Sequence, residues 1–378
     1  MRKRFAIPCH CEAGIRQPAD GGRSNPVRQR FESRDCFAPL AMTGLLFCAS
    51  LFTPSNLPAQ DIHFSQYMTT PLHNSPALTG LFEGDFRLGA NYRSQWGSVT
   101  VPYRTFAASG DMLIANGLLD GDLVGAGLWL YSDRAGDIAF GTNEAMLSLA
   151  YHKRLSEYGT HFLSAGFQAG IAQRGFDASK VTLDNQFADF GMSITIPPNE
   201  SFGKSSIIYP DVAAGVSWLL APTARSSIYA GAGFFHLNTP NQSFMSDVVP
   251  MDIRQTVFAG GSFALSGRMS LYPRAIAHLQ GAHTEYSFGT YLGLHMNHTV
   301  SVHETTLAFG VSSRWNDAVI FGVMLNHDAL GIGVSYDLNM SELAVASTAR
   351  GGPEMALGYM IDRGRHRLEG TVGNCPRF

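Results

Sequence analysis

The feature that most constrains this chain is an alternation of apolar and polar residues that begins near residue 86 and recurs to the end of the sequence. In the segment FRLGANYR, residues 86–93, every second residue from Phe86 to Tyr92 is apolar, and the residues between are polar or glycine. Successive side chains of a β-strand leave opposite faces of the sheet, so this segment has one apolar and one polar face. The alternation predicts a long antiparallel β meander.

About fourteen segments follow this pattern, each of roughly ten residues, and an even number of such strands is what a single-chain outer-membrane barrel requires. In residues 330–337, for example, large apolar residues alternate with glycine, serine and aspartate. The expected strands lie at 86–93, 101–109, 123–131, 145–154, 161–173, 207–219, 227–237, 256–265, 269–278, 284–294, 307–315, 319–326, 330–338 and 354–360.

Alternation alone does not decide whether the apolar faces meet in a soluble core or face lipid, so a secreted β-sandwich or propeller stays open at this point. Two features of the strands and one of the whole sheet favour a membrane barrel. Met355, Leu357 and Tyr359 give the last strand an apolar face suited to pairing with the first, and closure removes exposed strand edges. Aromatic residues gather near strand ends, where an interfacial girdle lies. They are Tyr92, Trp96, Trp129, Tyr131, Tyr151, Trp218, Tyr229, Tyr291, Trp315 and Tyr359.

The composition agrees with an all-β membrane protein. Only 15% of the residues are charged, against about 25% in an ordinary soluble domain. No apolar run approaches the roughly 20 residues that a spanning helix needs. The net charge of −3 and the absence of a basic cluster in the body of the sequence provide no electrostatic footprint for nucleic acid. We therefore predict a transmembrane antiparallel β-barrel of about fourteen strands, preceded by a cleaved signal peptide and a short extended N-terminal segment.

Residues 1–59 have the character of a leader. An apolar stretch at 37–52 is followed by TPSNLPA at 53–59, which resembles the apolar region and small-residue cleavage site of a secretory signal. We expect cleavage after Ala59, and the long basic region before it leaves the start codon open, with Met42 as one candidate. Four of the five cysteines fall in this leader, so the exported chain is expected to contain no internal disulfide.

The remaining chain divides into a periplasmic N-terminal segment at 60–82, the barrel at 83–361 and a tail at 362–378. If both ends of the barrel chain are periplasmic, the long connections at 174–206 and 238–252 lie outside the cell. Short turns at 156–160, 221–224 and 266–268 are then periplasmic, as is usual for such barrels. The connections at 280–283 and 316–317 are also short, although they would be external.

The sequence contains no Walker loop, dinucleotide fingerprint or zinc-protease helix motif. Paired glycines at 125–127, 231–233 and 331–333 lack a third glycine and are interpreted as small residues on a packed lumen face. Five histidines between 278 and 303 are not spaced as metal ligands. No G-x-S-x-G motif appears, and Ser164, Ser312 and Ser335 are expected to line the lumen. No catalytic, cofactor or metal site is predicted. The loop at 184–190 is either self-packed or a protein-docking surface.

Several short motifs resemble the PorP/SprF family of outer-membrane proteins. They are Phe64-Ser65-Gln66-Tyr67, Pro71-Leu72, Pro76-Ala77-Leu78-Thr79-Gly80 and Asn91-Tyr92-Arg93-Ser94-Gln95-Trp96. The segment 184–187 is similar to the mid-chain loop of that family, and the final residues 375–378 look like its ending. The resemblance covers essentially all of residues 60–378. Ser75 departs from the family, which usually has asparagine there, and the tail at 362–374 is longer and more charged than expected.

The resemblance implies a non-enzymatic barrel, linked to type IX secretion and gliding motility, in the outer membrane of a diderm bacterium. Its implied partners are membrane lipid, periplasmic peptidoglycan-associated secretion proteins, and a secreted cargo such as an adhesin. A passive porin or a hydrophobic-solute channel is the alternative, because small polar lumen residues suit it equally well. The family motifs mark candidate partner-binding residues: Phe64, Gln66, Tyr67, Asn91, Arg93, Gln95, Trp96, Asp184, Gln186 and Phe187.

Overall fold

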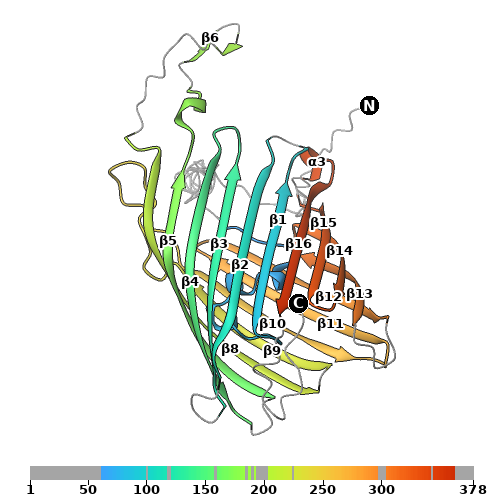
Figure 1. The fold of residues 1–378 in the computed structure, drawn as a ribbon. Coiled ribbons are helices and arrows are strands. Elements are labelled where there is room, and N and C mark those ends of the chain that lie inside the picture. Colours follow the sequence, from blue (N-terminus) through green and yellow to red (C-terminus); the bar gives the residue numbers. More distant parts are fainter. Residues whose placement is uncertain are drawn as a thin grey trace, which may run out of the picture. The chain divides into compact units, whose positions relative to one another are not determined.

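The computed structural model describes residues 61–98, 101–116, 121–156, 160–183, 186–188, 191–192, 203–223, 225–296, 304–341 and 344–361. Fourteen antiparallel strands close into one barrel (Figure 1). They are β1 (Phe86–Gln95), β2 (Tyr103–Asn116), β3 (Leu123–Ala135), β4 (Phe140–Arg154), β5 (His161–Gly175), β8 (Ser206–Thr223), β9 (Ser226–Phe235), β10 (Arg254–Ala264), β11 (Met269–Gln280), β12 (His283–His295), β13 (Thr305–Arg314), β14 (Ala318–His327), β15 (Leu330–Asn339) and β16 (Arg350–Ile361). The predicted leader at 1–59, the predicted tail at 362–378 and Asp184 lie outside the described residues.

Each barrel strand pairs with the next barrel strand along the chain, and β1 closes the ring against β16. The closing register runs from Phe86 opposite Ile361 to Arg93 opposite Glu354. Between β5 and β8 lie η3 (Ala178–Lys180) and two short strands, β6 (Phe187–Ala188) and β7 (Gly191–Met192), which pair with each other as an antiparallel hairpin. The predicted all-β class and the predicted number of barrel strands are confirmed. No helix among the described residues is long and apolar enough to cross a membrane.

The two faces of the barrel wall differ in the way that the alternation predicts. On β15, Ile332, Val334 and Tyr336 are exposed on the outer face. Their neighbours Ser335 and Asp337 are buried on the inner face. The predicted lumen positions of Ser164, Ser312 and Ser335 are confirmed, since all three are buried. A wall that is apolar outside and polar inside cannot be the sheet of a soluble sandwich, whose apolar face would be the buried one.

Four of the aromatic residues predicted for the interfacial girdle lie elsewhere. Trp129, Tyr131, Tyr229 and Tyr291 are buried on the lumen face, so this part of the prediction is wrong. On β3, Trp129 and Tyr131 share their face with Gly125 and Gly127, which is the inner one. Trp129, Tyr131 and Tyr229 lie inside the barrel because the lumen contains an apolar partner for them.

That partner is the chain that precedes β1. Residues 61–80, called the plug segment below, form three short helical turns inside the barrel: η1 (Tyr67–Thr69), α2 (Pro71–Asn74) and η2 (Pro76–Leu78). Leu72 of the plug segment packs in one buried cluster with Trp129 and Tyr131. Tyr67 packs in a second cluster with Tyr229.

The predicted extended conformation of this segment is wrong. Two of its turns begin at a proline, Pro71 and Pro76, whose fixed φ suits the first position of a helix. The hydroxyl of Ser75 also accepts a bond from the backbone N–H of Ala77. The segment does not pair with the wall as a strand, so its backbone groups need partners inside these turns or from side chains.

The two ends of the barrel carry different connections. One end, the long-loop end, has the connections 96–102, 136–139, 176–205, 236–253, 281–282, 315–317 and 340–349, the last of which contains α3 (Ala344–Ser347). The other end, the short-turn end, has the connections 117–122, 155–160, 224–225, 265–268, 296–304 and 328–329. The predicted assignment of long and short connections to the two ends therefore agrees with the strand order.

Candidate functional site: a plugged lumen

The plug segment crosses the lumen from the long-loop end toward the short-turn end. At its start, the backbone N–H of Asp61 donates to Gln280, the last residue of β11, across 3.0 Å. At its end, the N–H of Gly80 donates to Asp111 on β2 across 2.7 Å. The segment thus begins at the end opposite to the short turns and lies inside the barrel. Its predicted periplasmic location stays a prediction.

The first anchor is a charged cluster at the long-loop end. The carboxylate of Asp61 lies 2.7 Å from Nε2 of His236 and 3.2 Å from Nε of Arg254. The other ring nitrogen of His236 lies 2.6 Å from Asp211. Burial alone would lower the pKa of His236, but Asp61 and Asp211 outweigh it and raise the pKa to about 10. Burial likewise opposes the charge of Asp61, yet His236 and Arg254 hold the pKa of that carboxyl well below its usual range.

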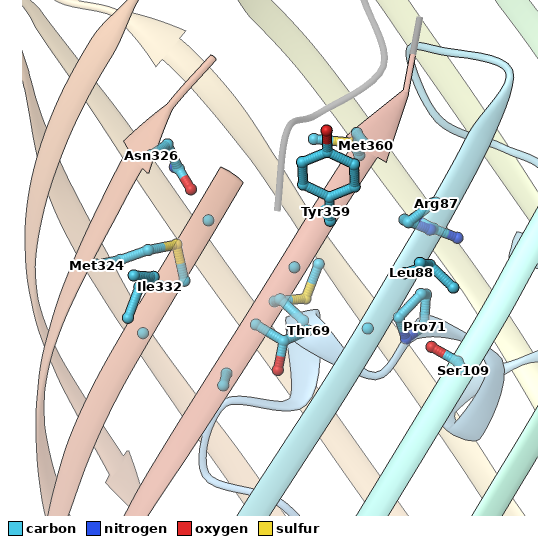
Figure 2. Close-up of a pocket in the computed structure, with 16 residues that line it drawn as sticks. Thr69, Pro71, Arg87, Leu88, Ser109, Met324, Asn326, Ile332, Tyr359 and Met360 are labelled. Carbon is cyan, nitrogen blue, oxygen red and sulfur yellow. The ribbon is translucent and has the colours of Figure 1, made fainter. Parts of the chain in front are cut away.

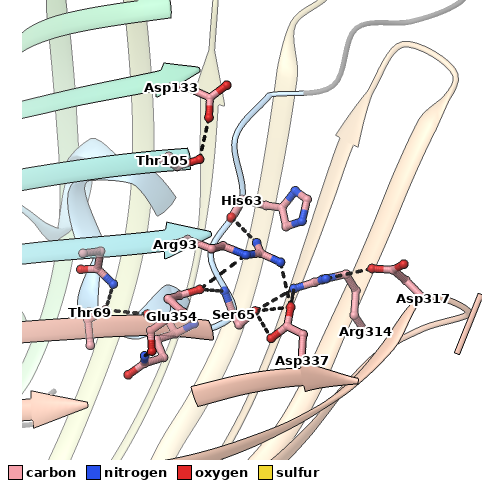
Figure 3. A network of polar contacts seen from close by, with 12 residues as sticks. His63, Ser65, Thr69, Arg93, Thr105, Asp133, Arg314, Asp317, Asp337 and Glu354 are labelled. Atoms are coloured by element: carbon pink, nitrogen blue, oxygen red, sulfur yellow. Dashed lines mark hydrogen bonds and ion pairs between the residues drawn. The ribbon is translucent and has the colours of Figure 1, made fainter. Parts of the chain in front are cut away.

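The second anchor is a network of buried charges from four strands (Figure 3). Asp337 on β15 lies 2.8 Å from Arg93 on β1 and 3.0 Å from Arg314 on β13. The hydroxyl of Ser65 donates to the same carboxylate at 2.7 Å. Glu354 on β16 accepts the backbone N–H of Ser65 at 2.7 Å and lies 3.8 Å from Arg93.

This network joins the plug segment to the seam where the barrel closes. Buried charges without partners are strongly destabilising, so each of these groups depends on the others. The N–H of Gln66 adds a further bond to Glu354 at 2.9 Å. Arg93 also donates to the backbone oxygen of His63. The plug segment therefore completes a set of interactions that the wall residues alone would leave unsatisfied.

The third anchor lies toward the short-turn end. Arg87 on β1 forms two bonds to Asp111, at 2.9 and 2.7 Å, and its guanidinium also donates to the backbone oxygen of Leu78 at 3.2 Å. Thr79 contacts Ser148 on β4 at 2.6 Å. The backbone oxygen of Thr79 lies 2.8 Å from Nε2 of His152. Both ends and the middle of the plug segment are thus bonded to different sides of the wall.

Glycines on the lumen face let the plug segment approach the wall closely. A methyl group at Gly166 would overlap the backbone of Pro76, and one at Gly125 would overlap Thr79. The same holds for Gly233 against Asn74 and for Gly333 against Gln66. The predicted role of the paired glycines, as small residues on a packed lumen face, is confirmed at Gly125, Gly233 and Gly333.

Two neighbouring cavities remain in the lumen beside the plug segment. The first lies between the plug residues Met68, Thr69 and Pro71 and the strands β1, β2 and β14–β16 (Figure 2). The second is lined by residues of β9–β14, among them Arg274 and Tyr291. Met324 and Asn326 line both cavities.

The structure brings five of the ten predicted site residues together inside the lumen. Phe64, Gln66 and Tyr67 belong to the plug segment, and Asn91 and Arg93 lie on the facing wall of β1. Asn91 donates to Thr69 at 2.6 Å. All five are buried, so they hold the plug segment in place. A role for them in partner binding stays a prediction.

The other predicted residues lie elsewhere. Gln95 ends β1, and the ring of Trp96 packs against Tyr103 with the ring centroids 4.9 Å apart. Gln186 is buried, and its side-chain oxygen accepts the N–H of Leu183 at 3.0 Å. Phe187 begins the β6–β7 hairpin. These residues belong to the long-loop end, where β1 ends and the connection between β5 and β8 lies.

Sequence reasoning missed the residues that hold the plug segment from the far side: Arg314, Asp337 and Glu354. A usable signal was present for Asp337, which follows Ser335 on the polar face of an alternating strand. A charged residue on the lumen face of a barrel strand needs a partner inside the barrel. The sequence gives no indication of which partner that is.

An ordered apolar surface is found at the long-loop end, on the loop 236–253. Phe244 of this loop packs against Phe176 and Phe140, at ring-centroid distances of 5.1 and 6.1 Å. The side chain of Asn241 accepts the N–H of Val249 at 2.9 Å, which shapes the tip. Val248 at the tip is 78% exposed and Met245 is 64% exposed.

Comparison with known families agrees with this architecture. The sequence profile of the family described as type IX secretion system membrane protein PorP/SprF matches residues 56–359. This chain belongs to the PorP/SprF family. The match includes the plug segment and nearly the whole barrel, so the protein is a membrane β-barrel of a type IX secretion family. The predicted family membership is confirmed. No curated protein sequence matches the chain significantly.

Solved structures with a similar fold are also membrane barrels. The Ralstonia pickettii toluene transporter TbuX has a TM-score of 0.43 at 10% identity, over 78% of this chain and 94% of TbuX. BamA from Haemophilus ducreyi has a TM-score of 0.40 at 9% identity, over 74% of this chain and 70% of that one. The Pseudomonas putida toluene transporter TodX has a TM-score of 0.39 at 10% identity, over 80% and 93%. Structural similarity at these TM-scores and sequence identities is no evidence of what this PorP/SprF protein binds.

Proposed function

We propose that this PorP/SprF protein is a plugged scaffold in the outer membrane that serves type IX secretion. Its long-loop end holds a secreted cargo protein, such as an adhesin, at the cell surface. Its short-turn end faces the periplasm and meets peptidoglycan-associated proteins of the secretion machinery. It carries out no reaction of its own.

The observation that carries this proposal is the plug segment. Asp61, Ser65 and Gly80 are bonded to the wall at three levels of the lumen. A barrel whose interior is filled and fixed in this way is suited to presenting its rims, because rigid elements position binding residues more accurately than a mobile interior does.

The exposed apolar tip of the loop 236–253 supports the long-loop end as the docking surface. Exposed apolar residues that are clustered and held by an ordered loop are typical of protein-binding sites. Phe140, Phe176 and Phe244 brace this loop against the barrel. The tip can therefore be presented to a partner without first being ordered, which lowers the entropic cost of binding.

The proposal is tested with a double substitution at the tip, Met245→Ser with Val248→Ser. The expected result is that less type IX cargo is found at the cell surface and copurifies with the barrel, while the amount of barrel in the membrane is unchanged. Met340→Ser is the matched control, because Met340 is 68% exposed at the same end but on the connection between β15 and β16. An equal loss of cargo in the control, or normal cargo display in the double variant, contradicts docking at this tip.

The alternative function is a passive porin or a hydrophobic-solute channel. The two small cavities beside the plug segment are the observation in its favour. A channel, however, needs a continuous path, and the plug segment with its charged anchors crosses the lumen. Conductance measurements in planar lipid bilayers separate the two functions.

A further inference from the structure

The outer face of the barrel wall carries very few charges. Among the strand residues that the structure describes, the Lys, Arg, Asp or Glu side chains that point outward are all cations: Arg104, Arg134, Lys153 and Arg350. Lys153 lies near the short-turn end of β4, and its amine is 3.0 Å from the carboxylate of Asp122. The three arginines lie at the long-loop end, on β2, β3 and β16. No carboxylate of the described strands shares the outer face with them.

Two of these arginines lie side by side. Arg104 on β2 is directly opposite Arg134 on β3. Their neighbours Thr105 and Asp133 are hydrogen-bonded to each other on the inner face at 2.6 Å (Figure 3), which turns both arginines outward. Both are exposed, and neither guanidinium has an ion pair within the described residues, which include Asp137 in the turn after β3. Like charges directly opposite each other in a sheet repel, so an anion between these two would be stabilising.

The third arginine lies across β1 from this pair. Arg350 begins β16, and its cross-strand neighbour Leu338 is exposed on the outer face. The next residue, Gly351, accepts the backbone N–H of Trp96 at 2.9 Å where β1 ends. The ring of Trp96 packs against that of Tyr103, the first residue of β2. An aromatic pair therefore lies between Arg350 and the two opposed arginines.

This aromatic pair indicates the depth of the arginines in the membrane. Trp and Tyr are enriched where the hydrocarbon core meets the lipid headgroups, and Tyr103 is 37% exposed. Toward the middle of the wall the outer face becomes apolar, since Phe106 on β2 and Leu128 and Leu130 on β3 are exposed. The arginines therefore lie at the level of lipid headgroups, with a surface for acyl chains beside them.

We infer that the outer face of β16, β1, β2 and β3 binds one phosphorylated membrane lipid at the long-loop end. Its phosphate lies between Arg104 and Arg134, with Arg350 adding positive charge two strands away, and its acyl chains lie on the apolar surface that includes Phe106. Guanidinium donors pair with phosphate oxygens through short, charge-assisted and frequently bidentate bonds. The apolar surface beside the cations favours a lipid over a free anion. This site rests on the membrane location of the barrel and not on cargo docking, so either can fail without the other.

The test counts the lipids that stay bound to the whole protein, extracted in detergent, by native mass spectrometry during a titration. The probe is dioleoylphosphatidic acid, which has a terminal phosphate and two acyl chains. The expected result is saturable binding that is roughly tenfold tighter than that of dioleoylglycerol, which has the same chains and no phosphate. Inorganic phosphate at equal concentration is expected not to displace the probe, because it has no acyl chains.

Substitutions locate the site on the wall. Arg104→Gln is expected to weaken binding of the probe by roughly tenfold, because charge-assisted bonds to the phosphate are lost, and adding Arg134→Gln is expected to weaken it further. Arg104→Lys keeps the charge but loses the planar donor fork, and it is expected to be intermediate. Lys153→Gln is the matched control, because it removes one outward cation from the short-turn end of the wall. It is expected to bind the probe as the unchanged protein does.

Arg350→Gln keeps the test decisive if the substitutions in the pair prevent insertion, because it removes a cation at the first residue of a strand and is also expected to weaken binding. Absence of saturable binding of the probe to the unchanged protein overturns the inference. Equal binding by the variant with both Arg104→Gln and Arg134→Gln, or an equal loss in Lys153→Gln, overturns it too. Displacement of the probe by inorganic phosphate would mean a site for free anions and would contradict a lipid site.

Discussion

Asp337 holds two buried arginines and the plug segment together beside the closing seam of the barrel. Its carboxylate lies 2.8 Å from Arg93 and 3.0 Å from Arg314, and it also accepts the hydroxyl of Ser65. Asp337→Asn leaves both guanidinium groups buried beside a neutral amide. Removing one partner of a buried ion pair costs about 3–5 kcal/mol. We therefore expect a loss of this size in the free energy of unfolding, measured by urea titration of the protein folded in lipid vesicles.

The control for this change is Asp317→Asn. Asp317 also lies 2.8 Å from Arg314, but its side chain is 40% exposed. Exposed ion pairs contribute about 0–1 kcal/mol, because water screens them. A loss of the same size in both variants would show that burial of the Asp337 network is not what stabilises the seam.

His236 gives the plug segment a dependence on pH. Its pKa in the folded protein is about 10, above the ordinary value of 6.5, because Asp61 and Asp211 outweigh the effect of burial. A raised pKa means that the stabilisation is complete below pH 6.5 and is lost as the pH rises toward 10. We expect the stability of the unchanged protein to fall over this interval more steeply than that of His236→Gln. The difference between their urea midpoints at pH 6 and pH 9.5 measures the effect, and identical slopes would contradict it.

The strands were predicted from the sequence, whereas the conformation of the plug segment was not. Alternation such as that of residues 330–337 depends only on the two faces of a local strand, so all fourteen barrel strands were predictable. The turns at Pro71 and Pro76 have no such period, and their conformation depends on partners more than 100 residues away. Ser75, for example, donates to the backbone oxygen of Ala232 on β9. Such pairings are set by the closed barrel and leave no local pattern in the sequence.

The aromatic residues show the same limit. Tyr92 and Trp129 look alike in sequence, since both are aromatic and lie in alternating strands. Tyr92 is exposed on the outer face and Trp129 is buried in the lumen. Which face a residue occupies follows from the phase of the alternation, but the presence of an apolar partner inside the barrel does not. Half of the residues predicted from the family motifs lie in the candidate site, and the charged partners of the site on β13, β15 and β16 were not predicted.

The fit between the plug segment and the wall depends on glycines. Gly166→Ala places a methyl group where the backbone of Pro76 lies. Because the segment is bonded to the wall at both ends, it cannot retreat freely, and overpacking of this kind costs typically 1–3 kcal/mol. We expect a loss in this range, together with faster hydrogen exchange in residues 61–80. Gly203→Ala is the control, since no atom of the described residues lies within 4 Å of the added methyl. A similar loss there would contradict the explanation by close packing.

The scaffold and the channel differ in one property of the whole barrel. A scaffold binds partner proteins at its two ends, whereas a channel lets solutes pass through its lumen. The family establishes a secretion-system membrane barrel, and the plug segment distinguishes a filled barrel from an open one. The charged anchors at Asp61, Ser65 and Gly80 reach different sides of the wall. A segment held in this way is expected to stay in place under an applied voltage.

Deleting residues 61–80 tests this directly in planar lipid bilayers. The unchanged protein is expected to show no large, steady conductance, because the plug segment and its ion pairs cross the lumen. The deletion removes the three helical turns and leaves the polar inner wall, which water and ions can enter as they do in open barrels, so large conductance steps are expected. Gly203→Ala, which leaves the plug segment intact, is expected to behave as the unchanged protein does. If the deletion variant does not insert, the unchanged protein still decides the matter, because a large steady conductance from it alone would mean a channel and would contradict the plugged scaffold.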